Sequence, residues 1–220
     1  MGFGRYRINW GNETYFEEVE TYFDALQAYS KNVGGFVDEQ VKNARTRYTS
    51  VQQVEEEHPY SFEMLDEYGK YLSANRLSDI LFDSCIVGTM SFIERKLLFL
   101  CKELETKNRI KLSDTSGKGI RKFHLYLTKV CDVKTDEVEV SWAKLRLFND
   151  LRNILVHSHL NRVIPKNRGD LLSMLRETPG VRLVIEAEGF SLHVSDDTIV
   201  QEQIRVGRQV LDHAFMERVS

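Results

Sequence analysis

The scarcity of proline limits how this chain can fold more than any other feature. The 220 residues contain three prolines, Pro59, Pro165 and Pro179. Because proline interrupts helix interiors, long segments without it favour long helices. Apolar and aromatic residues recur at spacings of three and four through most of these segments, which is the period of an amphipathic helix. The sequence therefore predicts an all-α protein.

The two longest helical patterns occupy the N-terminal half. The first is one long amphipathic helix or two in series, with an interruption expected at Gly34 and Gly35. The second has a C-terminal half that is apolar nearly all round, which predicts the central buried helix of the fold. The helices are expected at about residues 14–57, 61–107, 120–130, 138–159 and 198–218, with a loop at 108–119.

After Pro165 the apolar period changes from helical to alternating. Residues 181–185 and 190–194 flank Glu188 and Gly189, a pattern typical of a small β-hairpin. Asp196 or Asp197 can then cap the last helix. We expect a single domain over residues 1–220. Its expected parts are a core at about 61–163, an N-terminal helical elaboration at 1–60, and a C-terminal hairpin and helix at 164–220.

Charge is distributed unevenly along the chain. The formal net charge of −3 argues against a protein that coats nucleic acid over its whole surface. Between Trp142 and Arg168, however, six basic residues face one acidic residue, a local net charge of about +5. The positive field is therefore concentrated in one segment.

Other site chemistries find little support in the sequence. The cysteines Cys85, Cys101 and Cys131 are odd in number and lie in apolar surroundings, which favours buried thiols in a reducing, cytoplasmic compartment. The segment SDTSGKGIRK lacks the preceding strand and the glycine count of a P-loop. His124, His193 and His213 are scattered and have no Cys or His partner at metal-ligand spacing. We expect no metal, no cofactor, no secretory leader and no membrane segment.

The stretch LRNILVHSHL, residues 151–160, ends the fourth predicted helix with an unusual polar cluster. Asn153 and His157 are four residues apart and share a helix face, and the long side chain of Arg152 can reach the same side. Imidazole can move a proton to or from a ribose oxygen, guanidinium can stabilise charge on phosphate, and an amide can orient either group. The trio is suited to metal-independent cleavage of an RNA phosphodiester.

One histidine is too few for this reaction, because the acid and base roles fall on opposite oxygens. His159 is a candidate for the second role, yet two residues along a helix place it on the other side. A symmetric dimer would instead supply a second His157. A structural explanation stands beside these: Arg and His are common near helix C-termini, where cations interact favourably with the dipole and the free carbonyls.

The segment RNILVH, residues 152–157, resembles the arginine, polar residue and histidine signature of the HEPN superfamily, named for higher eukaryote and prokaryote nucleotide-binding domains. Its surroundings are similar too. Trp142 lies upstream in the same helix, and SFIERKLLFLCKEL and GKGIRKFHLYL precede it. The resemblance covers roughly residues 77–163 and is closest to bacterial members of the toxin and abortive-infection type.

The resemblance implies a helical-bundle homodimer with the motif of both chains in a shared cleft. In active members this cleft is a metal-independent endoribonuclease that leaves a 2′,3′-cyclic phosphate. By position, Arg152, Asn153 and His157 become the catalytic residues, and Glu94 matches an accessory acidic residue, with a surface salt bridge as its alternative.

Partners follow from the same interpretation. RNA is the expected substrate, and an antitoxin or another defence-system protein is an expected partner. Two other functions stay open: a non-catalytic HEPN module that binds nucleotide, RNA or a protein, and a helical scaffold in a defence complex. The residues expected to guide the RNA backbone, with solubilising charge as the alternative, are Lys144, Arg146, Arg162, Lys166 and Arg168.

Overall fold

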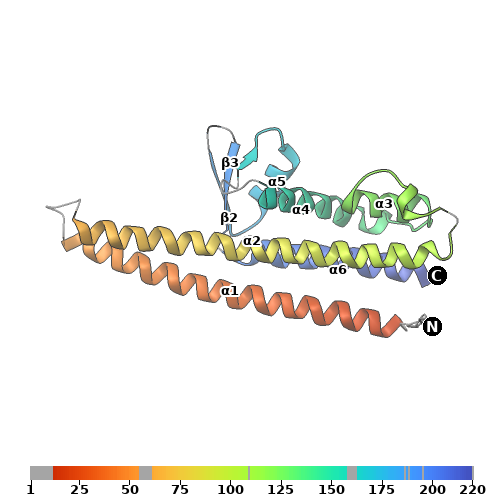
Figure 1. Cartoon of the computed structure of the whole chain (residues 1–220), viewed down its shortest axis with the longest axis horizontal. Helices are drawn as coiled ribbons and strands as arrows, with labels where there is room; N and C mark the ends of the chain where they lie inside the picture. Colours follow the sequence, from red (N-terminus) through yellow and green to blue (C-terminus); the bar gives the residue numbers. More distant parts are fainter. Residues whose placement is uncertain are drawn as a thin grey trace, which may run out of the picture.

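The computed structural model describes residues 12–54, 61–108, 110–157, 163–185, 187, 189–194 and 196–219. It is mainly helical, with one small sheet, so the predicted all-α class is confirmed (Figure 1). Within these residues no helix combines the length and apolar character needed to cross a membrane. The elements are α1 (Asn12–Val54), α2 (Phe62–Glu105), η1 (Leu112–Asp114), α3 (Gly119–Lys129), η2 (Asp136–Val138), α4 (Glu139–His157), β1 (Val163–Pro165), α5 (Gly169–Glu177), β2 (Val181–Ile185), β3 (Gly189–Val194) and α6 (Thr198–Val219).

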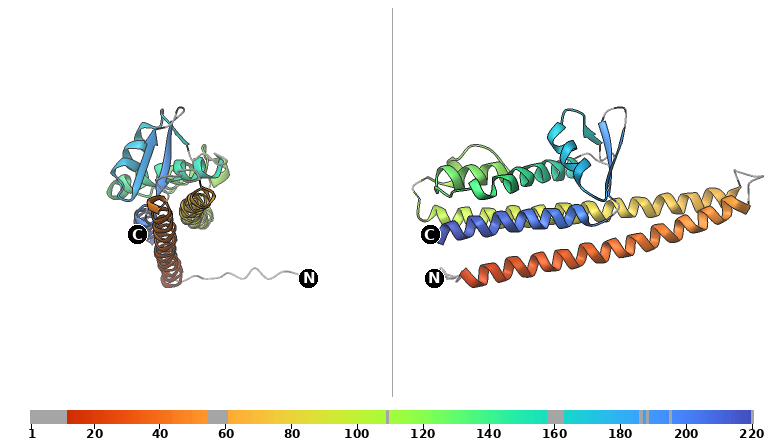
Figure 2. Two further views of the ribbon diagram at one scale, coloured as in Figure 1. Left: turned by 90° about the vertical axis from the view of Figure 1, so that its left-hand side faces the viewer. Right: turned by 180° about the vertical axis from the view of Figure 1, so that it is seen from behind.

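Helices α1 and α2 form a long antiparallel hairpin that extends well past the rest of the molecule (Figure 2). Helix α2 begins at Ser61, whose hydroxyl accepts a hydrogen bond from the Met64 amide at 3.1 Å. The expected interruption at Gly34 and Gly35 was wrong, because α1 is continuous. Val33 and Val37 are buried on either side of the glycines, and packing outweighs the low helix propensity of two residues.

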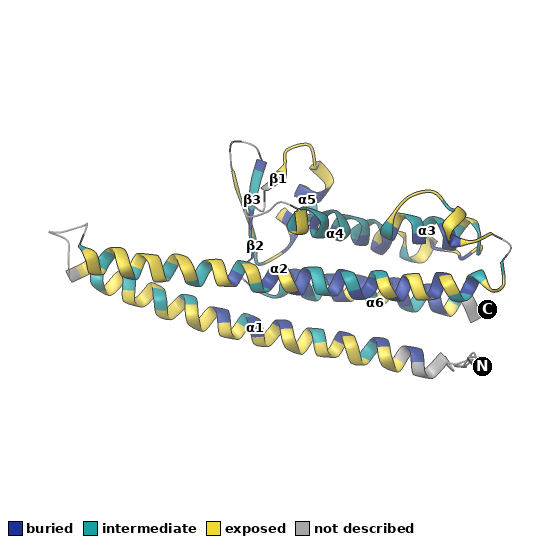
Figure 3. Ribbon diagram, in the orientation of Figure 1, coloured by how far each residue is buried: buried dark blue, intermediate teal, exposed yellow. Residues whose placement is uncertain are grey.

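The core lies where the second half of α2 is surrounded by the other helices. Residues from Phe82 to Leu104 supply most of the buried side chains of α2, as the sequence predicted (Figure 3). Helix α6 packs against α1, α2 and α4, and its Gly207 faces side chains of α1 and α2 at close range. A Cβ atom on Gly207 would overlap the Ile93 side chain and lie 3.4 Å from the Phe23 ring. The half of the hairpin next to its tip carries many exposed residues.

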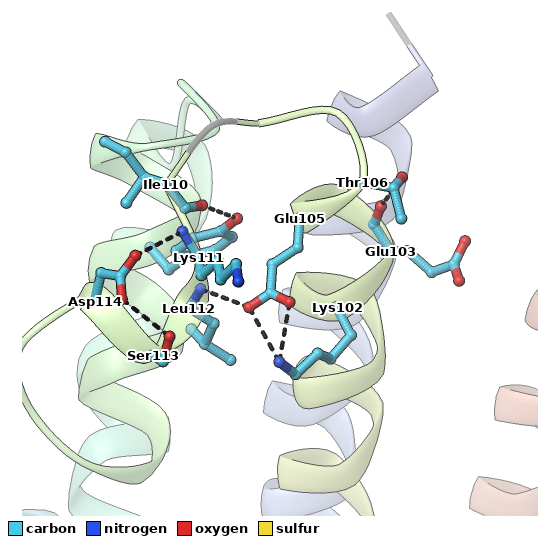
Figure 4. A network of polar contacts seen from close by, with 10 residues as sticks. Lys102, Glu103, Glu105, Thr106, Ile110, Lys111, Leu112, Ser113 and Asp114 are labelled. Atoms are coloured by element: carbon cyan, nitrogen blue, oxygen red, sulfur yellow. Dashed lines mark hydrogen bonds and ion pairs between the residues drawn. The ribbon is translucent and has the colours of Figure 1, made fainter.

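The connection from α2 to α3 is held by a carboxylate near the end of α2. Glu105 accepts a hydrogen bond from the Leu112 amide at 2.5 Å and from the Lys102 ammonium at 2.9 Å (Figure 4). These bonds lower the pKa of Glu105, with Lys102 as the larger cause. The Tyr126 hydroxyl of α3 donates to the Ile110 carbonyl at 3.0 Å. The predicted loop is therefore a tethered connection, and it fixes the position of α3 beside α2.

The predicted β-hairpin is confirmed, and it belongs to a slightly larger unit. Strands β2 and β3 pair antiparallel, and β1 adds to the other edge of β3, which gives the order β1-β3-β2. Helix α5, which the sequence pattern did not predict, precedes β2 and packs on α4. The Asp196 carboxylate accepts a hydrogen bond from the Thr198 amide at 2.9 Å, as expected for the start of α6.

Candidate functional site

Helix α4 presents its polar face next to a firmly packed apolar face. Trp142, Leu145, Phe148 and Leu151 are fully buried and fix the helix against α2 and α6. Asp150, Asn153 and His157 follow at intervals of three and four residues, and so they line one side of α4. His157 is the last residue of the helix and is exposed. The motif therefore ends at the surface on a rigid support.

The guanidinium of Arg152 is oriented by two side chains. One Nη donates to the Asn153 Oδ1 at 3.0 Å, and the other lies 3.9 Å from the Glu94 Oε2. Arg152 thus turns toward the Asn153 side, as the length of its side chain allows. Both members of the ion pair are about a quarter exposed. Among the described residues no acceptor reaches the buried Nε of Arg152, so its two Nη groups make the polar contacts.

Glu94 places its carboxylate among three helices. It belongs to α2, pairs with Arg152 of α4, and lies close to the first residue of α3. That residue, Gly119, has φ of +52°, and a Cβ atom there would come within 3.0 Å of the Glu94 Oε1. Glu94 is thus a partly buried ion-pair partner of Arg152. Its expected accessory role in catalysis stays a prediction.

A second ionic cluster lies one turn before Asn153. The Asp150 carboxylate is 3.3 Å from the Arg168 guanidinium and 3.7 Å from that of Arg121. Arg121 comes from the start of α3, and Arg168 directly precedes α5. Sequence reasoning missed Arg121, although it lies in the segment SDTSGKGIRK that was considered for phosphate binding. Asp150 therefore contacts two exposed arginines on the side of α4 that carries the motif.

The other basic residues that were expected to bind RNA contact different partners in the structure. Lys144 pairs with Glu202 of α6 at 2.7 Å, and Arg146 pairs with Glu139 of its own helix at 3.0 Å. Lys166 donates to the Ala187 carbonyl at 3.4 Å. By helical geometry Arg146 lies on the same side of α4 as His157, whereas Lys144 lies on the opposite side. Arg168 reaches the His157 side through its contact with Asp150. Their role at RNA stays a prediction.

Two expected residues, His159 and Arg162, lie outside the described residues. Two described histidines, His124 and His193, contact carboxylates outside the motif. His124 contacts Glu139 at 3.4 Å, about 27 Å along α4 from His157, and burial lowers its pKa. His124 is therefore not placed to share a phosphate with His157 of the same chain. His193 lies 4.0 Å from Asp79, which is about 22 Å along α2 from Glu94.

Metal and thiol chemistry find no candidate site in the described part of the chain. No group of three or more His, Cys, Asp or Glu side chains there has the arrangement of a metal site. Cys85 and Cys101 are buried, and burial raises the pKa of Cys101 to about 12, so this thiol is protonated at neutral pH.

No protein-family model, no curated protein and no solved structure matches this chain at a significant level. The resemblance to the HEPN superfamily therefore depends on the motif and its sequence context alone.

Proposed function

We propose that this protein is a metal-independent endoribonuclease of the HEPN type, with an active site completed by a second copy of the chain. The observation that carries the proposal is the placement of Arg152. A carboxylate and an amide orient its guanidinium five residues before the exposed His157, which ends the same helix. An oriented cation and an exposed imidazole are the groups that metal-independent phosphodiester cleavage uses.

Each step of the proposed reaction is carried by a named side chain of the motif or its partner Glu94. His157 of one copy accepts the proton of the ribose 2′-hydroxyl, and the 2′-oxygen attacks the neighbouring phosphorus. The second copy's His157 donates a proton to the 5′-oxygen as the P–O bond breaks. Arg152 stabilises the negative charge on the non-bridging oxygens, and Asn153 and Glu94 keep the guanidinium in position. The products are a 2′,3′-cyclic phosphate and a 5′-hydroxyl.

Exposed arginines on the motif side of α4 would bind the RNA backbone. Arg121 and Arg168, both tied to Asp150, would contact backbone phosphates beside the scissile one. DNA would be inert, because it lacks the 2′-hydroxyl nucleophile. In the cell such an enzyme would serve as a toxin or phage-defence effector, held in check by an antitoxin or another partner.

The test is cleavage of RNA by the purified full chain in excess EDTA. We expect cyclic-phosphate ends and a bell-shaped pH profile around neutrality. Arg152→Ala and His157→Ala should each lower turnover by at least about a hundredfold while RNA affinity changes little. His193→Ala is the matched control, since it removes a half-exposed imidazole that contacts Asp79 of α2 and no residue of the motif.

Two outcomes would count against this function. Strict dependence on Mg²⁺ would exclude the proposed chemistry. An inactive wild-type protein that binds RNA or nucleotide through Arg152 would indicate the binding module instead. In cells, expression of the wild-type chain should arrest growth, and the His157→Ala chain should not.

A further inference from the structure

Beyond the site at α4, the other face of α2 carries a layered contact with α1. Tyr22 stacks on Phe92 with ring centroids 3.7 Å apart, and Tyr15 lies nearly parallel to Phe99 at 6.1 Å. The two layers are seven positions apart on each helix, from Tyr15 to Tyr22 on α1 and from Phe92 to Phe99 on α2, which is about 10 Å along the axis. Between the two layers lies a third, formed by an ion pair instead of aromatic rings.

A cavity of about 400 Å³ opens at this middle layer. Its deep wall is formed by the buried rings of Tyr15 and Phe92, and its mouth by Tyr22 and Phe99, which are each 36% exposed. The exposed Arg95 also lines it. This volume lies within the range of small-molecule sites, which are largely apolar with a few placed polar groups.

The polar group in this cavity is the ammonium of Lys96. Lys96 is 8% exposed, and its Nζ lies 5.3 Å and 5.5 Å from the ring centroids of Tyr15 and Phe92. Its ion-pair partner is the Glu18 carboxylate at 2.7 Å. Burying an ammonium costs free energy that a leucine at the same helix position would not, so a gain in stability is a weak explanation for a lysine here.

Glu18 indicates what kind of anion this ammonium accepts. The Glu18 side chain is 55% exposed, so it can turn into solvent without leaving a buried carboxylate behind. In the structure, the Glu18 carboxylate occupies the position on Lys96 that a ligand carboxylate would take. The surrounding rings favour a flat apolar body, which they can contact by their edges and faces.

We propose that this cavity binds a small aromatic carboxylate, with its ring between Tyr22 and Phe99 and its carboxylate on Lys96 in place of Glu18. The site is separate from the proposed active site, because Lys96 and Glu94 are two residues apart and point to nearly opposite sides of α2.

Binding of 2-naphthoate to the full chain, measured by calorimetry, tests this site. The matched neutral compound is 2-naphthamide. We expect one site per chain and an affinity for the carboxylate at least about tenfold above that for the amide. Lys96→Met should abolish this preference and keep the binding of the amide, which also shows that the cavity persists. Lys102→Met, an exposed lysine on the same helix outside the cavity, is the control.

A second variant separates ligand binding from a structural ion pair. Glu18→Gln removes the internal competitor, so the affinity for 2-naphthoate should rise severalfold. The proposal is overturned if 2-naphthoate does not bind at millimolar concentration, if Lys96→Met keeps the preference, or if Glu18→Gln weakens binding.

Discussion

The carboxylate of Glu202 is paired with two basic side chains. It accepts hydrogen bonds from Arg205 and from Lys144, each at 2.7 Å. These contacts, with Arg205 as the largest cause, lower the pKa of Glu202 to about 2. An unfolded glutamate has a pKa of about 4.3, so folding favours the ionised form. The resulting stabilisation is complete above about pH 5 and is lost as the pH falls toward 2.

Glu202→Gln should therefore lower the free energy of unfolding at pH 7 by about 2 kcal/mol, after allowance for solvent screening. At pH 3.5 the difference from the wild type should be clearly smaller, because the wild-type protein is then losing the same contribution. Urea unfolding at the two pH values measures this. A difference that is constant with pH would contradict the assignment.

At the candidate site, the sequence predicted the motif residues but not all of their partners. Arg152, Asn153 and His157 lie within six positions, so helical geometry alone relates them. Arg152 and Glu94 are in contact but lie 58 positions apart in sequence, on different helices. Only the resemblance pointed to Glu94. Arg121 had no such signal, because its relation to Asp150 arises from how α3 packs against α4.

At the scale of the elements, two glycines in helix interiors should respond oppositely to the same change. Gly207→Ala in α6 should lower the free energy of unfolding by about 1–3 kcal/mol, because its Cβ would overlap Ile93. Gly34→Ala in α1 should raise it by about 0.5–1 kcal/mol, since no atom lies within 4 Å of the added group and alanine favours the helix.

Thermal or urea unfolding of both variants checks this pair, and each serves as the control for the other. Stabilisation by Gly207→Ala would mean that α6 does not pack on α2 as closely as described.

The predicted helices and strands differ from the structure where local signals were weak or outweighed. Strong periodicity made α2, α3, α4 and α6 predictable to within a few residues. Helix α5 has only nine residues between Pro165 and Pro179, so its apolar residues Leu171, Leu172 and Leu175 form too short a pattern to stand out. Strand β1 has three residues and ends in proline, which is too short to show a period. The pairing of β1 with β3 is a tertiary contact that local sequence does not encode.

For the whole molecule, the proposed mechanism requires two chains, and mixed dimers test this requirement. A dimer of one wild-type chain and one His157→Ala chain, isolated through two different affinity tags, would contain a single His157. It should be nearly as inactive as the doubly substituted dimer, because one phosphate needs both imidazoles. A mixed dimer with His193→Ala should keep full activity.

If the mixed His157→Ala dimer kept about half of the wild-type rate, each chain would work alone. The shared site would then be excluded, even if Arg152 and His157 proved essential.

The long α1–α2 hairpin affects how such dimers are recognised in solution. The 43 residues of α1 extend about 65 Å, whereas a compact chain of 220 residues has a radius of gyration of about 17 Å. A rod-like projection of this length increases friction, so even a monomer will elute early from a gel-filtration column calibrated with spherical standards. Sedimentation equilibrium or light scattering, which report mass independently of shape, will distinguish one chain from two.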